Sequence, residues 1–282
     1  MAKISTGTKL GMLVALCLLA ACLAVIYNEL RKFEYAQVYH PSKDIVHWNN
    51  GNEVERKEVH FNAADGVKLD GWFFPADANS PRKQMAILVC HGNGGNLTYL
   101  EALYTRLAET GANVLLFDYR GYGKSEGQPS EEGTYRDAQA AYQWLRQSGF
   151  AATNIFVYGE SLGGAIAAEL VLREPAGGLI LEGSPTSIAD MGAALFPWLP
   201  VRLLNHLKYD TRAKMARLKV PLFVMHSRDD NVVPFRMGQQ NYGAANGAKM
   251  FWEVKGGHVS AGEEYHEGME RFLTATEIKR PH

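Results

Sequence analysis

The sequence predicts an α/β fold in which a mostly parallel sheet carries helices on both faces. Short apolar runs alternate with longer amphipathic stretches along most of the 282 residues, a pattern typical of βαβ units. Several of these runs end in polar, glycine-rich segments, and parallel sheets bind their ligands at that edge. Beyond the N-terminus about 250 residues remain, enough for one domain with a full core.

Eight strands are expected, and the first two differ from the others. Val54–Phe61 and Val67–Phe74 flank Ala64-Asp65-Gly66, which is typical of a hairpin turn, so these strands are predicted to be antiparallel. The remaining predicted strands are Met85–Cys90, Asn113–Phe117, Asn154–Tyr158, Gly178–Leu181, Pro221–His226 and Met250–Val254. The expected helices cover Leu97–Thr110, Glu131–Ser148, Ser161–Arg173, Pro234–Ala245 and Tyr265–Thr274.

A G-x-S-x-G segment, Gly159-Glu160-Ser161-Leu162-Gly163, lies where the fifth predicted strand gives way to a helix. A serine on so sharp a turn needs small residues on either side, and the turn exposes its hydroxyl at the edge of the sheet. The N-terminus of the following helix stabilises negative charge that develops beside it. The context favours a catalytic nucleophile at Ser161 over an ordinary tight turn.

A serine nucleophile needs a base, and the base needs a partner that fixes its tautomer. Two later strands end in suitable groups. Asp229 and Asp230 follow Pro221–His226, and His258 follows Met250–Val254. The order serine, acid, histidine is one of the known arrangements of a catalytic triad.

The strand Met85–Cys90 ends in the glycine-rich segment His91-Gly92-Asn93-Gly94-Gly95-Asn96. A loop of this kind beside a nucleophile presents backbone N–H groups to a developing oxyanion. The expected donors are the N–H groups of Asn93 and Leu162.

Five segments carry a family resemblance: His91–Asn96 (HGNGGN), Phe117–Ser125 (FDYRGYGKS), Tyr158–Gly164 (YGESLGG), His226–Pro234 (HSRDDNVVP) and Gly256–His258 (GGH). Together they resemble serine hydrolases of the α/β-hydrolase superfamily, in particular the membrane-anchored branch of lysophospholipase-like, esterase or depalmitoylating enzymes. The resemblance runs through almost the whole chain after about residue 55 and implies the α/β-hydrolase fold. Ser227 departs from the pattern, since relatives usually carry glycine there.

The resemblance selects Asp230 as the acid of the triad, because the family pattern places it four residues after His226. Asp229 is expected to be a solvated or loop-capping residue. Glu182, at the end of the strand Gly178–Leu181, is the alternative acid.

The other candidate groups are expected to be structural. His91 and His226 are interpreted as hydrogen-bonding histidines, and the resemblance implies that Arg120 and its loop tie neighbouring loops together. The remaining histidines show no spacing typical of metal ligands, so neither a metal nor another cofactor is expected.

The N-terminus predicts a membrane attachment. An almost unbroken apolar run covers Leu10–Tyr27, long enough to span a bilayer. An uncleaved anchor is one interpretation, lipidation at Cys22 after Leu19-Ala20-Ala21 is a second, and a buried helix of a soluble protein is a third. The expected organisation is a hydrophobic segment (1–28), a linker (29–52) and a catalytic domain (53–282), with the catalytic domain on the non-cytoplasmic side.

The segment between Glu182 and Pro221 is too short for a large cap over the site. Its notable part is the apolar stretch Leu195–Val201, which contains two prolines. One interpretation is a lip that contacts acyl chains or dips into a membrane. The other is a loop that packs its aromatic residues on the core.

The sequence thus predicts a membrane-tethered serine hydrolase of amphiphilic acyl esters or thioesters. Ser161 would attack the acyl carbonyl, with His258 as the base and Asp230 as its partner. A peptidase or an acyltransferase with the same triad, or a non-catalytic scaffold, are the alternatives. The net charge of −1 and the absence of a basic patch exclude a typical nucleic-acid-binding protein.

Overall fold

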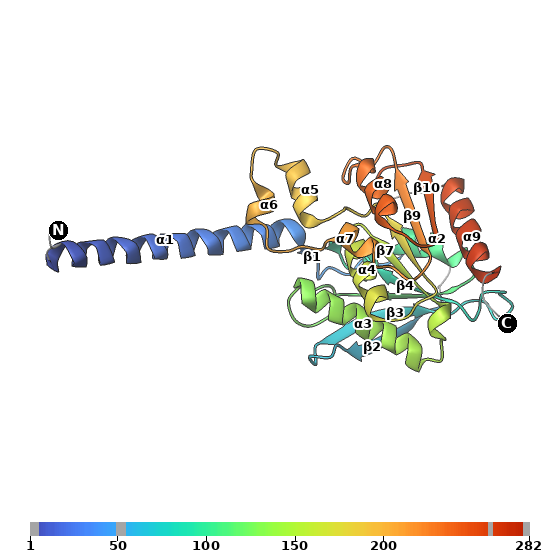
Figure 1. Cartoon of the computed structure of the whole chain (residues 1–282). Helices are drawn as coiled ribbons and strands as arrows, with labels where there is room; N and C mark the ends of the chain where they lie inside the picture. Colours follow the sequence, from blue (N-terminus) through green and yellow to red (C-terminus); the bar gives the residue numbers. More distant parts are fainter. Residues whose placement is uncertain (1–5, 49–54, 259–261, 279–282) are drawn as a thin grey trace.

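The computed structural model describes residues 6–48, 55–258 and 262–278, with a sheet of eight strands at its centre (Figure 1). The strands follow the order β10-β9-β8-β7-β4-β6-β3-β2. From β10 to β6 neighbouring strands are parallel, whereas β3 is antiparallel to both β6 and β2. The mostly parallel sheet and the initial hairpin are therefore confirmed.

The strands of this sheet are β2 (Lys57–Asn62), β3 (Lys68–Phe74), β4 (Ala86–Cys90), β6 (Asn113–Phe117), β7 (Ile155–Glu160), β8 (Gly178–Glu182), β9 (Leu222–Ser227) and β10 (Lys249–Val254). The helices that follow them are α2 (Glu101–Ala108), α3 (Glu131–Gln147), α4 (Gly163–Arg173), α5 (Ile188–Leu195), α6 (Val201–Leu204), α7 (Thr211–Met215), α8 (Phe235–Ala244) and α9 (Glu263–Ile278). A short 3₁₀ helix, η2 (Ala152–Asn154), precedes β7.

Both faces of the sheet are covered because its central strands are apolar on both sides. Successive residues of a strand point to opposite faces. In β4, Leu88 belongs to one buried cluster with residues of α3 and α4, and Ile87 belongs to a second with residues of α2 and α9. This double core fixes the carboxyl ends of the parallel strands at one edge.

The helix expected over Leu97–Thr110 is wrong in one respect, since a 3₁₀ helix, η1 (Leu97–Tyr99), precedes α2. Asn96 starts η1 because its side chain accepts a hydrogen bond from Thr98 N. Asp118 Oδ1 also accepts from Leu97 N at 2.7 Å, which ties this start to the loop after β6.

Helix α1 (Thr6–Val38) projects from the domain as a long rod (Figure 1). It is long and apolar enough to cross a membrane, and none of its apolar window is buried in the protein. A core helix of a soluble protein would be buried, so that interpretation does not fit. The helix continues beyond residue 28 through residues 29–38, where ion pairs such as Arg31–Glu34 (2.9 Å) stabilise it.

After α1 the chain enters the domain directly. Strand β1 (His40–Pro41) pairs with β5 (Gly94–Gly95) in the glycine-rich loop after β4. Helices α5 and α6, with the loop between them, form a small cap (residues 188–204) beside the end of α1 (Figure 1). The excursion between β8 and β9 is thus short, as predicted.

Candidate active site

Ser161 lies on a strained turn between β7 and α4. Its φ is 51°, a left-handed conformation that is rare for a residue with a side chain. Gly163 permits the turn, because a Cβ atom there would lie 1.9 Å from the carbonyl oxygen of Cys90. The N–H of Ser161 donates to the carbonyl of Glu182 at 2.9 Å, which fixes the turn to the end of β8.

The structure brings the predicted acid and base together. His258 Nδ1 lies 2.8 Å from Asp230 Oδ2, across the carboxyl ends of β9 and β10. Asp229, by contrast, is exposed and points its backbone N–H at Ser227 Oγ. Because the carboxylate is ionised and acceptor-only, His258 Nδ1 carries the proton and Nε2 is left as the basic nitrogen.

Four donors hold the Asp230 carboxylate. His226 Nε2 lies 3.2 Å from Oδ2, and the N–H groups of Val232 and Val233 each donate to Oδ1 at 2.8 Å. Burial alone would raise the pKa of Asp230, but the hydrogen bonds from His226, His258 and the two N–H groups outweigh it and hold the pKa well below its ordinary value. Asp230 is therefore ionised at neutral pH.

His226 was expected only to be structural, and its contact with Asp230 is a new element of the site. Its Nε2 also lies 3.0 Å from the carbonyl oxygen of Val233. Two acceptors at one nitrogen place the proton on Nε2. The sequence spacing of His226 and Asp230 does not by itself reveal the contact, because a turn between them decides it.

His258 packs against Gly183, whose φ is +54°. A Cβ atom at position 183 would lie 3.1 Å from Cε1 and 3.2 Å from Nδ1 of the imidazole. Burial alone would lower the pKa of His258, but the hydrogen bond and charge of Asp230, aided by Glu160 and Glu182, raise it above 6.5. Both residues are described, and no hydrogen bond joins Ser161 to His258; such contacts often tighten only when substrate binds.

The alternative acid, Glu182, is bound by other side chains. It is fully buried at the end of β8, where Arg106 Nη1 donates to it at 3.2 Å and the hydroxyl of Tyr158 also donates to it. The ring of Tyr265 lies 4.4 Å from the Arg106 guanidinium. This buried ion pair supports the strand beneath Ser161, and Asp230 is the carboxylate that contacts His258.

The two expected oxyanion donors lie at the same cavity as Ser161. In the described part of the chain, neither the N–H of Asn93 nor that of Leu162 donates to another group. Leu162 immediately precedes α4, where the helix dipole adds positive potential. The backbone thus offers two N–H groups at one site.

His91 and Arg120 have the structural contacts that were expected. His91 Nδ1 lies 2.7 Å from the carbonyl oxygen of Gly92, and burial lowers the pKa of this histidine to about 4. Arg120 donates to Asp137 Oδ1 at 2.8 Å and to Asp65 Oδ2 at 2.8 Å, joining α3 to the β2–β3 turn. Both side chains are buried, so neither faces the substrate.

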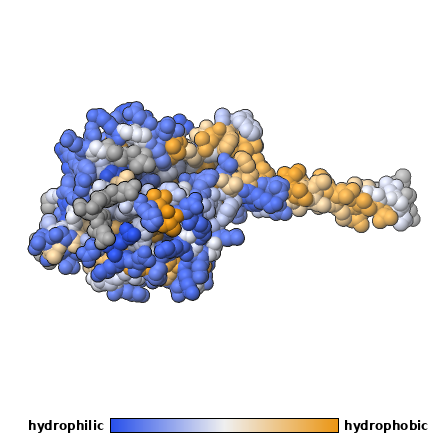
Figure 2. All heavy atoms as spheres, turned by 180° about the vertical axis from the view of Figure 1, so that it is seen from behind, coloured by the Kyte–Doolittle hydropathy of each residue, from blue (hydrophilic) through white to orange (hydrophobic). Residues whose placement is uncertain are grey.

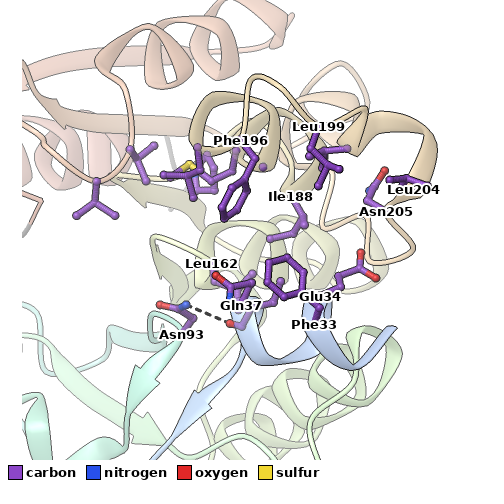
Figure 3. A pocket seen from close by; sticks show the side chains of 18 of the residues that line it. Phe33, Glu34, Gln37, Asn93, Leu162, Ile188, Phe196, Leu199, Leu204 and Asn205 are labelled. Atoms are coloured by element: carbon purple, nitrogen blue, oxygen red, sulfur yellow. Dashed lines mark hydrogen bonds between the residues drawn. The ribbon is translucent and has the colours of Figure 1, made fainter. Parts of the chain in front are cut away.

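A mostly apolar cavity of about 230 Å³ opens beside Ser161 (Figure 3). Ile188, Phe196 and Leu199 of the cap form one wall. Phe33 and Gln37 of α1 form the wall opposite (Figure 3). The stretch Leu195–Val201 does not pack all its aromatic residues on the core, because Trp198 is 78% exposed. The contribution of α1 was not foreseen in the sequence.

The chain is similar to known hydrolases. The family described as "Serine aminopeptidase, S33" matches residues 81–213. An uncharacterized protein of Mycobacterium tuberculosis, Rv2307c, is 35% identical over 270 residues, 92% of this chain and 95% of that protein. This chain belongs to the α/β-hydrolase superfamily. Another relative of this α/β hydrolase, lysophosphatidylserine lipase ABHD12 of Danio rerio, is 33% identical over 183 residues, 58% of this chain and 48% of that protein.

Solved structures show the same α/β-hydrolase fold. The esterase Pf2001 of Pyrococcus furiosus superposes with a TM-score of 0.67 and 21% identity, covering 85% of this chain and 98% of its own. At that identity the likeness supports the fold alone.

Proposed function

We propose that this α/β hydrolase is a membrane-tethered serine hydrolase that cleaves carboxylic esters or thioesters of acyl chains. The observation that carries the proposal is the 2.8 Å contact of Asp230 with His258 at the sheet edge that also holds Ser161. The apolar cavity beside Ser161 suits an acyl chain, and a relative is named as a lysophosphatidylserine lipase.

In the proposed reaction Ser161 Oγ attacks the acyl carbonyl while His258 Nε2 takes the hydroxyl proton. Asp230 stabilises the imidazolium that results. The N–H groups of Leu162 and Asn93 stabilise the oxyanion of the tetrahedral intermediate. His258 then returns the proton to the leaving alcohol or thiol, and water releases the acid from the acyl-enzyme by the same steps.

The tether in this proposal is α1, retained as an uncleaved anchor with the catalytic domain on the non-cytoplasmic side. Cys22 lies on this helix and is exposed, so lipidation there is the second form of attachment. Intact-mass measurement of the purified protein separates the two, because an uncleaved anchor retains Lys9 and a lipoprotein begins at a modified Cys22. Protease protection in sealed vesicles tests the orientation.

Peptide hydrolysis is the second candidate function, because the matching family is described as a serine aminopeptidase. An aminopeptidase site needs a group that binds the substrate's ammonium. Glu34 lines the cavity, but its Oε1 accepts hydrogen bonds from the N–H groups of His206 and Leu207 at 2.7 and 2.8 Å. The apolar lining therefore favours acyl chains, and parallel assays with p-nitrophenyl esters and aminoacyl naphthylamides decide between the two.

Labelling with a fluorophosphonate tests the nucleophile. The wild type is expected to react and Ser161→Ala is expected not to. Ser148→Ala, at the exposed end of α3, is the matched control and should label like the wild type. Folded wild-type protein that resists the probe and hydrolyses no ester would overturn the proposal in favour of a scaffold.

A further inference from the structure

One face of α1 lines the cavity beside Ser161. The lining residues of α1 include Leu30, Phe33, Glu34, Gln37 and Val38. The last four of these residues follow Leu30 by three, four, seven and eight positions, so all five lie on a single helix face. The ring of Phe33 meets that of Phe196 edge to face, with centroids 6.1 Å apart, so α1 and the cap close the cavity together (Figure 3).

Polar contacts hold α1 against the cap and against the loop that follows α6. Arg31 Nη2 donates to the carbonyl of Leu204 at 2.5 Å, and Glu34 accepts from His206 and Leu207. At the end of the helix, Tyr39 Oη lies 2.8 Å from Tyr209 Oη. The last turns of α1 therefore form a fixed wall of the cavity.

This wall begins at the membrane boundary. The apolar run Leu10–Tyr27 rises about 27 Å at 1.5 Å per residue, close to the ~30 Å of a hydrocarbon core. Glu29 is the first charged residue after it, and Leu30 follows directly. Phe33 lies only about 9 Å beyond Tyr27 along the helix axis.

The cap presents apolar side chains next to this boundary. Leu195, Trp198 and Leu203 are 58%, 78% and 86% exposed. In Figure 2 the apolar surface of the cap lies beside α1, whose own surface is apolar along most of its length. Exposed apolar patches of this kind mark contacts with membranes or partners.

We propose that α1 forms part of the substrate site as well as the anchor. The acyl chain of a membrane-resident, single-chain amphiphile enters between α1 and the cap, with its ester carbonyl at Ser161 and its tail pointing back toward Leu30. The cavity is smaller than the ~300–1,000 Å³ of pockets that enclose whole drug-sized ligands, so it holds one chain and leaves the head group outside. This inference rests on the proposed function.

The preference for acyl-chain length tests whether α1 lines the substrate site. The full chain is reconstituted in phosphatidylcholine vesicles, and kcat/KM is measured for acetyl, decanoyl and tetradecanoyl esters. Leu30→Trp fills the cavity and should lower the decanoyl-to-acetyl ratio of kcat/KM about tenfold, because a hydrophobic pocket discriminates by at least about this factor for one methylene. Leu30→Ala enlarges the cavity and should raise the tetradecanoyl-to-decanoyl ratio. Misfolding would lower activity on all esters, whereas here one substitution of Leu30 disfavours longer chains and the other favours them.

Lys32→Trp is the matched control. Lys32 is 73% exposed and lies about 200° around the helix from Leu30. The Lys32→Trp variant should leave the decanoyl-to-acetyl and tetradecanoyl-to-decanoyl ratios at their wild-type values. Wild-type ratios in both Leu30 variants would overturn the inference while the proposed function stands. A wild type that hydrolyses no ester and resists the fluorophosphonate would overturn the proposed function itself, and the inference with it.

The direction of the chain is tested with a decyl fluorophosphonate that carries a terminal diazirine. The phosphonate fixes one end to Ser161, and irradiation then attaches the other end to its neighbours. Peptide mass spectrometry is expected to find the cross-link in residues 29–37 or 201–205. Attachment confined to α8 or the loop before it would overturn the proposed direction.

Discussion

The side-chain amide of Asn93 donates a hydrogen bond to the carbonyl of Val38 at 3.1 Å, which joins the loop beside the nucleophile to the last residue of α1. In return, His40 N donates to the carbonyl of Asn93 at 3.0 Å, and the hydroxyl of Tyr122 donates to the same oxygen at 2.9 Å. The position of the Asn93 N–H is therefore set by the end of α1.

Asn93→Ala keeps the backbone N–H but removes the bond to Val38. We expect kcat to fall roughly five- to tenfold with little change in KM, since one hydrogen bond contributes about 1 kcal/mol and an oxyanion donor acts in the transition state. Asn246→Ala, which removes an exposed side-chain bond to Ala216 O, should leave kcat unchanged. A raised KM with normal kcat in Asn93→Ala would instead assign the residue to substrate binding.

Removal of the triad groups gives graded losses. Ser161→Ala and His258→Ala should each lower kcat by about 10⁶, and Asp230→Asn by about 10⁴, as in other Ser-His-Asp sites. Asp229→Asn is the control, because its side chain is exposed. Steady-state kinetics on a p-nitrophenyl ester measure these losses, and equal losses for the two aspartates would show that the acid is misassigned.

The pH dependence of kcat/KM reports His258. Only the neutral imidazole accepts the Ser161 proton, so activity should rise with pH through an apparent pKa above 6.5. Asp230→Asn removes the strongest source of this raised pKa and should move the midpoint to lower pH. Glu160→Gln should move it in the same direction by less, because its charge contributes less than that of Asp230. A midpoint that stays in place in Asp230→Asn would contradict the assignment.

Gly183→Ala should impair catalysis beyond its effect on stability. The new Cβ would lie 3.1–3.3 Å from His258, at a φ of +54°. Gly66→Ala, at a φ of +85° with nothing within 4 Å of the new Cβ, carries the backbone penalty alone. Urea unfolding and kinetics on both variants separate the two effects: both proteins should lose stability, and only Gly183→Ala should lose kcat. Equal activity in both would show that His258 tolerates the contact.

Arg120→Ala should be strongly destabilising, because it leaves the fully buried Asp137 carboxylate without its cation. We expect a loss of about 3–5 kcal/mol in the free energy of unfolding. Arg271→Ala breaks an exposed ion pair with Glu267 and should cost no more than about 0.5 kcal/mol. Urea unfolding compares the two variants, and similar midpoints would contradict a structural role for Arg120.

The sequence predicts the sheet well because its signals are local. Apolar runs that end in turn residues mark strands such as β4 and β7, and Ala64-Asp65-Gly66 marks the hairpin. The split of the expected helix at Leu100 into η1 and α2 was missed, since Asp118, which binds the N–H of Leu97 at the start of η1, is distant in the chain. Helix boundaries thus depend on tertiary contacts, which local helix propensity does not predict.

For the site, residue types and chain order were enough to propose Ser161 and His258, and the family resemblance then selected Asp230 over Asp229. The contact of His226 with Asp230 was not predicted, since it depends on the conformation of the turn between them. The role of α1 was also missed, although Leu30, Phe33 and Gln37 show helical spacing. Their position directly after an apolar run suggests a linker. Only the structure shows that this face of α1 lines the same cavity as the cap.

The carboxyl end of α1 also sets a limit on how this enzyme can be shortened. A chain cut just before Ser42 would lose Phe33, the carbonyl that binds Asn93, and the strand that pairs with Gly94–Gly95. A shortened version therefore has to begin upstream of Leu30 and keep the following turns helical. For the same reason, any helix fused in place of the apolar part of α1 has to be joined in helical register, so that its rotation about the axis leaves Phe33 facing Phe196.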